Sequence, residues 1–299
     1  MVLTRFLLSF VLLVLASQAL AATAPAPVSP IAIQSQLDVF YGADANRPDH
    51  ELQTLDVYWP AKGSKRIEKR PVIIYLHGGG WAFGDKSEIN NKVDYFVPNG
   101  FALVSINYRL RWDYKLLDQL EDVVSAIVWV RQNAKKYGLD GSRIVLMGHE
   151  AGGHLASLIG TDGRYLRSQG LSLQDVKAVV AIDSLSYDIP RVHKELGSFV
   201  QRRQHRLVFG DDVSVQLEAS PIHHVTAAKQ IPSFALLYAS GNEGSTLQAQ
   251  AFAKALSDAK VNALMIPGNS QSNLSIDVEL GSPGDVTTGG LMAFLRAST

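Results

Sequence analysis

The sequence predicts an α/β fold: a mostly parallel central sheet with helices on both faces and a small insertion over the C-terminal edge of the sheet. Two observations carry this prediction. Short apolar runs alternate with helical patterns from residue 71 to the end, the order that parallel β-α-β units require. The chain has 299 residues, of which 46% are hydrophobic, enough for one such domain with a large core.

The sheet is expected to begin with antiparallel strands. Residues 37–41 and 52–59 have strand character, and in the second run the side chains alternate: Leu55, Val57 and Trp59 point one way, Asp56 and Tyr58 the other. After a polar loop, residues 71–76 form a short, fully apolar run. Such a run is typical of a strand buried on both faces.

The remaining elements continue the alternation. The further predicted strands are residues 101–107, 144–147, Val176–Ile182, 233–240 and 261–266. The predicted helices are Leu116–Tyr137, which is amphipathic and ends at Gly138, a helix that follows residue 150, and the segments 247–259 and 286–296.

Residues 185–229 interrupt this rhythm. The segment is longer than an ordinary connection, so we interpret it as the insertion over the C-terminal edge of the sheet. It contains a group of basic residues: Arg191, Lys194, Arg202, Arg203 and Arg206. A solvated helix face is the common explanation for such a group, and attraction of an anionic ligand is the alternative.

The N-terminus has the pattern of a secretory signal peptide. Arg5 precedes an apolar run over residues 6–16, and Ala19-Leu20-Ala21 supplies an A-x-A cleavage site. We therefore predict a signal peptide over residues 1–21, a linker over 22–35 and one domain over 36–299. The apolar run is shorter than the ~20 residues that span a bilayer. The expected product is exported, periplasmic or secreted, without stable membrane insertion after cleavage; an uncleaved anchor is the alternative.

Composition and spacing exclude several kinds of site. The 28 basic and 28 acidic residues balance, which gives no reason to expect nucleic acid as a partner. Without cysteine there is no disulfide, thiol catalysis or cysteine-zinc site. His149 and His154 are five residues apart, about 140° around a helix, so they do not match the H-E-x-x-H zinc motif. We expect both to pack beside the turn, and we predict neither a metal nor a cofactor.

Two glycine-rich turns carry the functional signal. His77 and Gly78 begin the segment His77-Gly78-Gly79-Gly80-Trp81, which follows the strand at 71–76. Gly148 and Gly152 flank Glu150 between a strand and a helix, the architecture of the G-x-S-x-G nucleophile elbow. The central residue, however, is glutamate.

These motifs, with Tyr108-Arg109-Leu110 between them, resemble the α/β-hydrolase superfamily, closest to esterases and lipases of the hormone-sensitive-lipase and kynurenine-formamidase-like type. The resemblance covers about residues 36–299. It implies an oxyanion hole whose backbone donors are Gly79, Gly80 and Ala151. A plain tight turn is the alternative explanation for the glycines.

The catalytic triad is where the sequence departs from that family. The serine position holds Glu150, and the acid is expected at Glu243, after the strand at 233–240. The family's histidine falls at Asn273, in the segment Asn273-Leu274-Ser275-Ile276 before Leu280-Gly281-Ser282-Pro283-Gly284-Asp285. Asparagine cannot accept a proton, and glutamate is not an activated alkoxide. We expect the Glu150 carboxylate to fill the oxyanion hole.

Three functions fit this pattern. The first is a catalytically silenced hydrolase that binds an ester-like small molecule or a protein partner. The second is a hydrolase that uses Glu150 as nucleophile, as haloalkane dehalogenases and epoxide hydrolases use an aspartate, although those enzymes keep their histidine. The third is an esterase with a substitute serine, Ser184 or Ser186, and a base from elsewhere. His223 and His224 could reach the site from the end of the insertion.

Overall fold

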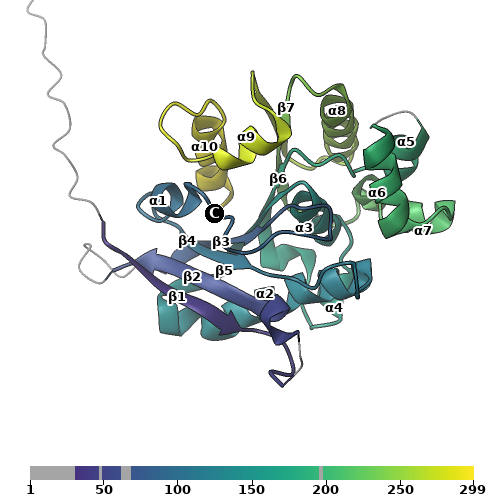
Figure 1. Ribbon diagram of the computed structural model, residues 1–299. Coiled ribbons are helices and arrows are strands. Elements are labelled where there is room, and N and C mark those ends of the chain that lie inside the picture. The colour runs from purple at the N-terminus through teal and green to yellow at the C-terminus, as the bar shows by residue number, and fades with distance from the viewer. Residues whose placement is uncertain (1–30, 47–48, 62–68, 195–197) are drawn as a thin grey trace, which may run out of the picture. The chain divides into compact units, whose positions relative to one another are not determined.

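A computed structural model describes residues 31–46, 49–61, 69–194 and 198–299. Residues Ile31–Thr299 form one compact unit, and the predicted signal peptide lies outside the described residues. The unit is built on one eight-stranded sheet, with the order β1-β2-β4-β3-β5-β6-β7-β8 (Figure 1). The strands are β1 (Ile33–Phe40), β2 (Thr54–Pro60), β3 (Arg70–Leu76), β4 (Ala102–Ile106), β5 (Leu139–His149), β6 (Val176–Ile182), β7 (Ser233–Ala239) and β8 (Ala263–Gly268).

The sheet is mostly parallel, as predicted. Strand β2 is antiparallel to both β1 and β4, and every later pairing is parallel. Alternate side chains of a strand enter opposite core layers: in β3, Ile74 and Leu76 enter one layer, whereas Ile73 and Tyr75 enter the other. Both layers are apolar, which explains why the central strands are uninterrupted hydrophobic runs.

Helices cover both faces of the sheet (Figure 1). The first layer is filled by α2 (Leu116–Tyr137), α3 (Ala151–Thr161) and α8 (Glu243–Asp258), and the second by α1 (Lys92–Phe96), α9 (Asn273–Val278) and α10 (Thr288–Ser298). Helix α2 has the predicted bounds and ends at Gly138, whose φ of 69° lets its N–H bond to Ala134 O. The predicted helix at 286–296 corresponds to α10.

Several elements differ from the prediction. Strand β1 begins at Ile33, which pairs with Pro60, so residues 33–35 belong to the sheet and not to the linker. Helix α8 begins at Glu243 instead of residue 247, because the Asn242 side chain caps it by accepting the N–H of Ser245. Helices α1 and α9 were not predicted, since five and six residues are too few to show a period.

The predicted insertion is a group of short helices between β6 and β7. It comprises α5 (Ile189–Lys194), α6 (Phe199–Phe209), α7 (Val213–Glu218) and the 3₁₀ turn η3 (Pro221–His224). Its beginning is tied to α8, because the Gln248 carboxamide bonds to both the N–H and the C=O of Asp188, at 2.8 and 2.9 Å. Among the described residues, none of the helices is both long enough and apolar enough to cross a bilayer.

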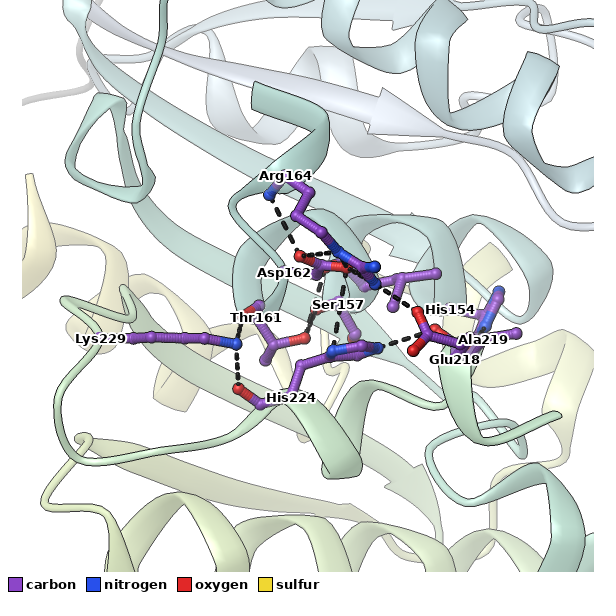
Figure 2. A network of polar contacts seen from close by, with 10 residues as sticks. His154, Ser157, Thr161, Asp162, Arg164, Glu218, Ala219, His224 and Lys229 are labelled. Carbon is purple, nitrogen blue, oxygen red and sulfur yellow. Dashed lines mark hydrogen bonds and ion pairs between the residues drawn. The ribbon is translucent and has the colours of Figure 1, made fainter. Parts of the chain in front are cut away.

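A polar network fastens the end of the insertion to α3 and the turn after it (Figure 2). Arg164 bonds to Asp162 and, at 2.5 Å, to Glu218 of α7. His224 Nε2 bonds to Glu218 O at 2.7 Å, while Lys229 Nζ donates to the carbonyl oxygens of Thr161 and His224. Three of these residues, Glu218, His224 and Lys229, come from the insertion, so the network sets the position of the insertion relative to α3.

Candidate active site

Glu150 lies at the sharp turn between β5 and α3. Its φ of 47° is in a region that side chains other than glycine rarely adopt. Two backbone hydrogen bonds hold the turn, one from Glu150 N–H to Ile182 O at 2.8 Å and one from His154 N–H to Glu150 O at 3.0 Å. The flanking glycines are required by space: a Cβ on Gly148 would overlap the backbone of Gly152, and a Cβ on Gly152 would overlap Leu76 O.

The glycine-rich loop after β3 is directed at the Glu150 carboxylate. The N–H groups of Gly79 and Gly80 donate to Glu150 Oε2 at 2.9 and 3.0 Å. Both glycines have positive φ, 102° and 61°, which aims their N–H groups at one point. The expected hydrogen bonds to this carboxylate are present from Gly79 and Gly80, two of the three expected donors. Within the described chain, Ala151 N–H makes no hydrogen bond to it.

His77, at the start of the glycine-rich loop, packs against Tyr108. Its ring stacks on Tyr108 with centroids 4.3 Å apart, and the Tyr108 hydroxyl donates to His77 O at 2.8 Å. Burial lowers the pKa of His77 to about 4, so its ring is neutral at pH 7. Burial and, after it, the charge of Glu150 raise the pKa of Tyr108. His77 therefore packs under the loop as an uncharged ring.

Trp81 joins the loop to α3. Its Nε1 donates to His154 Nδ1 at 3.2 Å, and His154 Nε2 lies 2.8 Å from Ala219 O. One ring nitrogen accepts and the other donates, which is the pattern of a neutral imidazole. Burial also lowers the pKa of His154 to about 4. The prediction that His154 packs beside the turn is confirmed, and its partners at Trp81 and Ala219 place it between the loop and the insertion.

Asn273 lies at the start of α9, close to a buried carboxylate. Its side-chain N–H donates to Asp183 Oδ2 at 2.7 Å. Asp183 follows β6, is 1% exposed, has a φ of 47° and also accepts the N–H of Ala239 at 2.8 Å. Glu243, predicted to be the acid, is exposed at the first turn of α8, and no hydrogen bond joins it to Asn273 among the described residues. The carboxylate beside Asn273 is thus that of Asp183.

His149 also faces the Asn273 segment. Its Nε2 lies 2.9 Å from Asn273 O, and its side chain is largely buried. Because a carbonyl oxygen only accepts, Nε2 carries the proton in this contact. The prediction that His149 packs beside the turn is confirmed. His149 and His154 face different partners, Asn273 on one side and Trp81 with Ala219 on the other.

A cavity of about 140 Å³ opens in front of Glu150. Strand ends, α8, α9 and the insertion helix α6 all contribute to its wall: Trp81, Glu150, Asp183, Leu185, Ser186, Gln201, Gln204, His205, Asn242, Ser245 and Asn273. The Gln204 carboxamide lies over Gly80, where it fills the space that a Cβ would take. The insertion therefore closes the site above the Gly79–Gly80 donors.

One serine–histidine pair lies in this wall. Ser186 Oγ is 3.2 Å from His205 Nε2, and both side chains are buried. Burial, and then the neighbouring His193 and His154, lower the pKa of His205 to about 3. Ser184 is buried as well, and its hydroxyl has no hydrogen-bond partner among the described residues.

Other predicted participants lie elsewhere. His224 bonds to Glu218 O, and His223 lies 3.8 Å from Asp188, so neither is part of the cavity wall. Among the described residues, the basic side chains of the insertion do not line the cavity either. One of them, Arg206, forms an ion pair with Asp211 at 3.2 Å. These placements favour the solvated-face explanation for the basic group.

Sequence reasoning missed Asp183, Gln204 and His205. Asp183 had a readable signal, because it directly follows the apolar strand β6 beside the elbow strand. Gln204 and His205 had none, since their approach to Gly80 and Ser186 depends on how the insertion folds back.

A family model described as BD-FAE matches residues 55–253, two thirds of the chain and all of the segment from β2 into α8. The chain belongs to the BD-FAE family.

Curated relatives of this BD-FAE member include esterases. It is 28% identical over 208 residues to the probable carboxylic ester hydrolase LipM of Mycobacterium tuberculosis, covering 67% of this chain and 46% of LipM. It is 31% identical over 233 residues to esterase LipC of the same organism, covering 74% of this chain and 57% of LipC. The chain thus spans about half the length of these relatives.

Solved structures support the same fold. The BD-FAE member superposes on esterase B of Lactobacillus rhamnosis with a TM-score of 0.72 at 22% identity, over 89% of this chain and 87% of that chain. Together with the eight-stranded sheet and its helices, these similarities identify an α/β hydrolase of the esterase and lipase type.

Proposed function

We propose that this protein is a catalytically silenced, exported hydrolase that keeps the esterase fold and pocket and serves as a binding or structural protein. The observation that carries the proposal is the pair of hydrogen bonds from Gly79 and Gly80 to Glu150 Oε2. In an ester hydrolase of this fold, such donors stabilise the oxygen of the tetrahedral intermediate. Here a side chain of the protein itself occupies them.

The chemistry at the elbow supports the same conclusion. Acyl transfer by this fold needs a hydroxyl at the turn and a neighbouring base that takes its proton. Position 150 supplies a carboxylate, and the amide of Asn273 cannot accept a proton in place of histidine. The charge-assisted bonds from Gly79 and Gly80, reinforced by the N-terminus of α3, stabilise the carboxylate where it is.

We propose export because of the sequence pattern at the N-terminus alone. Arg5, the apolar run over 6–16 and Ala19-Leu20-Ala21 follow the order of a cleaved signal. The intact mass of the exported protein tests this: we expect a chain that begins at Ala22, and a mass that includes residues 1–21 would contradict it.

The proposed silencing can be tested by removing the Glu150 side chain, which occupies the N–H donors of Gly79 and Gly80. A short alkyl phosphonate carries an anionic oxygen that mimics the tetrahedral intermediate. We expect Glu150→Ala to bind a soluble methylphosphonate monoester measurably by calorimetry, while the parent does not, because its own carboxylate blocks the Gly79 and Gly80 N–H groups. Equal binding by parent and variant would contradict the proposal.

A second candidate function rests on the 3.2 Å contact between Ser186 and His205. In this alternative the protein is an active hydrolase with a substitute nucleophile. A histidine with a pKa of about 3 is a weak base at pH 7, and His205 Nδ1 has no partner to orient the ring among the described residues. Ester hydrolysis that Ser186→Ala and His205→Gln each abolish would establish this alternative over the silenced hydrolase.

A further inference from the structure

The cavity in front of Glu150 has acidic walls without a basic counterpart. Glu150 and Asp183 both line it, and no lysine or arginine does among the described residues. Its one imidazole, His205, has a pKa lowered to about 3 by burial and is therefore uncharged at pH 7. The balance is negative, although the whole chain is neutral.

The two carboxylates differ in whether their oxygens already accept hydrogen bonds from the protein. Asp183 already accepts from Ala239 N–H through one oxygen and from Asn273 through the other. Glu150 uses Oε2 for Gly79 and Gly80, whereas Oε1 has no hydrogen bond and the side chain has no ion pair within the described chain. Glu150 is half-buried, so its unpaired charge faces the cavity and not only bulk water.

The other polar groups of the wall are carboxamides and hydroxyls. Gln201, Gln204, Asn242 and Asn273 bring carboxamides, and Ser245 brings a hydroxyl. The amide oxygens of Gln201 and Asn242 already accept the N–H groups of Ser198 and Ser245. These neutral groups leave the Oε1 atom of Glu150 as a charged acceptor without a cationic partner in the described wall, which suits a ligand group that is positive and donates. A primary ammonium has three N–H donors, no acceptor and a positive charge, whereas a carboxylate ligand would be repelled by the like charges of Glu150 and Asp183.

From this geometry we propose that the cavity binds the ammonium group of a small primary amine, with Glu150 as its counter-ion. The inference rests on the proposed function, because it requires Glu150 to remain a fixed carboxylate at the elbow. The volume of about 140 Å³ is well below the ~300–1,000 Å³ of pockets that enclose drug-sized ligands. The cavity therefore admits a head group with a short carbon stem.

Three probes of equal length separate charge from shape. The purified protein is titrated with n-propylammonium, n-propanol and propionate, and binding is followed by protein NMR chemical shifts. We expect n-propylammonium to bind at least tenfold more tightly than either other probe, a difference of about 1.4 kcal/mol. Raising the salt concentration should weaken its binding, because the attraction is electrostatic.

Glu150→Gln is the decisive variant. Its amide oxygen can still accept from Gly79 and Gly80, so the elbow is preserved while the charge is lost. We expect the affinity for n-propylammonium to fall at least tenfold and the affinity for n-propanol to stay unchanged. The control Asp258→Asn removes the same charge from an exposed pair with Lys254 at the far end of α8 and should alter neither affinity.

Equal affinities for the three probes, no binding of n-propylammonium, or an unchanged affinity in Glu150→Gln would each overturn the inference. None of these readouts involves ester hydrolysis. Failure of the inference therefore leaves the silenced hydrolase standing, while ester hydrolysis by the parent protein would remove the proposed function itself.

Discussion

The side-chain amide of Asn273 lies 2.7 Å from Oδ2 of Asp183, across from the elbow. Asp183 comes from the end of β6 and Asn273 from the first turn of α9, so two segments 90 residues apart meet at this contact. The resemblance to esterases predicts the catalytic histidine at position 273. A histidine placed there would find a buried carboxylate already in position, and that carboxylate is not Glu243.

This contact predicts which acid a restored triad would use. In a Glu150→Ser, Asn273→His background, we expect Asp183→Asn to lower kcat for a short p-nitrophenyl ester by on the order of 10²–10⁴-fold, because the histidine loses its orienting carboxylate. Glu243→Gln is the matched control and should leave the rate within about twofold. The reverse ranking would restore Glu243 as the acid.

Gly152 is expected to be indispensable to the elbow. Gly152→Ala places a methyl group against the carbonyl oxygen of Leu76, so part of β3 or α3 must move. We predict a loss of about 1–3 kcal/mol in the free energy of unfolding, measured by urea denaturation. Gly289→Ala, in α10 with open space around it, should be neutral or stabilise by up to about 1 kcal/mol. Equal effects of the two substitutions would contradict this account of the turn.

Buried histidines make the fold sensitive to mild acid. Burial lowers the pKa of His77 and His154 to about 4 and that of His205 to about 3, from the ordinary value of 6.5. Below pH 6.5 the unfolded chain takes up protons that the folded chain does not, so the free energy of unfolding falls as the pH falls. From pH 7 to pH 5, each of these residues should cost about 2 kcal/mol.

A single substitution isolates this effect. In His205→Gln, the difference between the free energies of unfolding at pH 7 and pH 5 should shrink by about 2 kcal/mol, whatever the substitution does to stability at pH 7. An unchanged difference in His205→Gln would mean that this imidazole takes up a proton in the folded state.

The strands, helices and elbow turn could be predicted from the sequence because each of them depends on a pattern within one short stretch of the chain. The apolar runs of β3, β5 and β6 and the amphipathic period of α2 are each readable in one window, and the glycines at 148 and 152 identify the turn between β5 and α3. The contact of Glu150 with Gly79 and Gly80 followed from the same motifs. These parts of the site could be predicted without coordinates.

The rest of the site depends on long-range placement. Whether Asp183 or Glu243 faces Asn273 is decided by where α9 begins relative to β6 and α8, and both acids follow a strand in the sequence. The contact of His205 with Ser186 and that of Gln204 with Gly80 come from α6, in an insertion whose fold has no local signature. No spacing rule in the chain relates such segments to the elbow.

The central claim, that Glu150 and Asn273 silence an otherwise intact esterase site, is tested most directly by the initial rates of p-nitrophenyl acetate hydrolysis for four proteins: the parent, Glu150→Ser, Asn273→His and the double variant, with folding checked by circular dichroism. Loss of a triad typically costs ~10⁶-fold in kcat, and its members act as a unit. We predict that the double variant exceeds the parent and both single variants by at least ~10²-fold. A parent that already matches the double variant, or a folded double variant that stays inert, would contradict the claim.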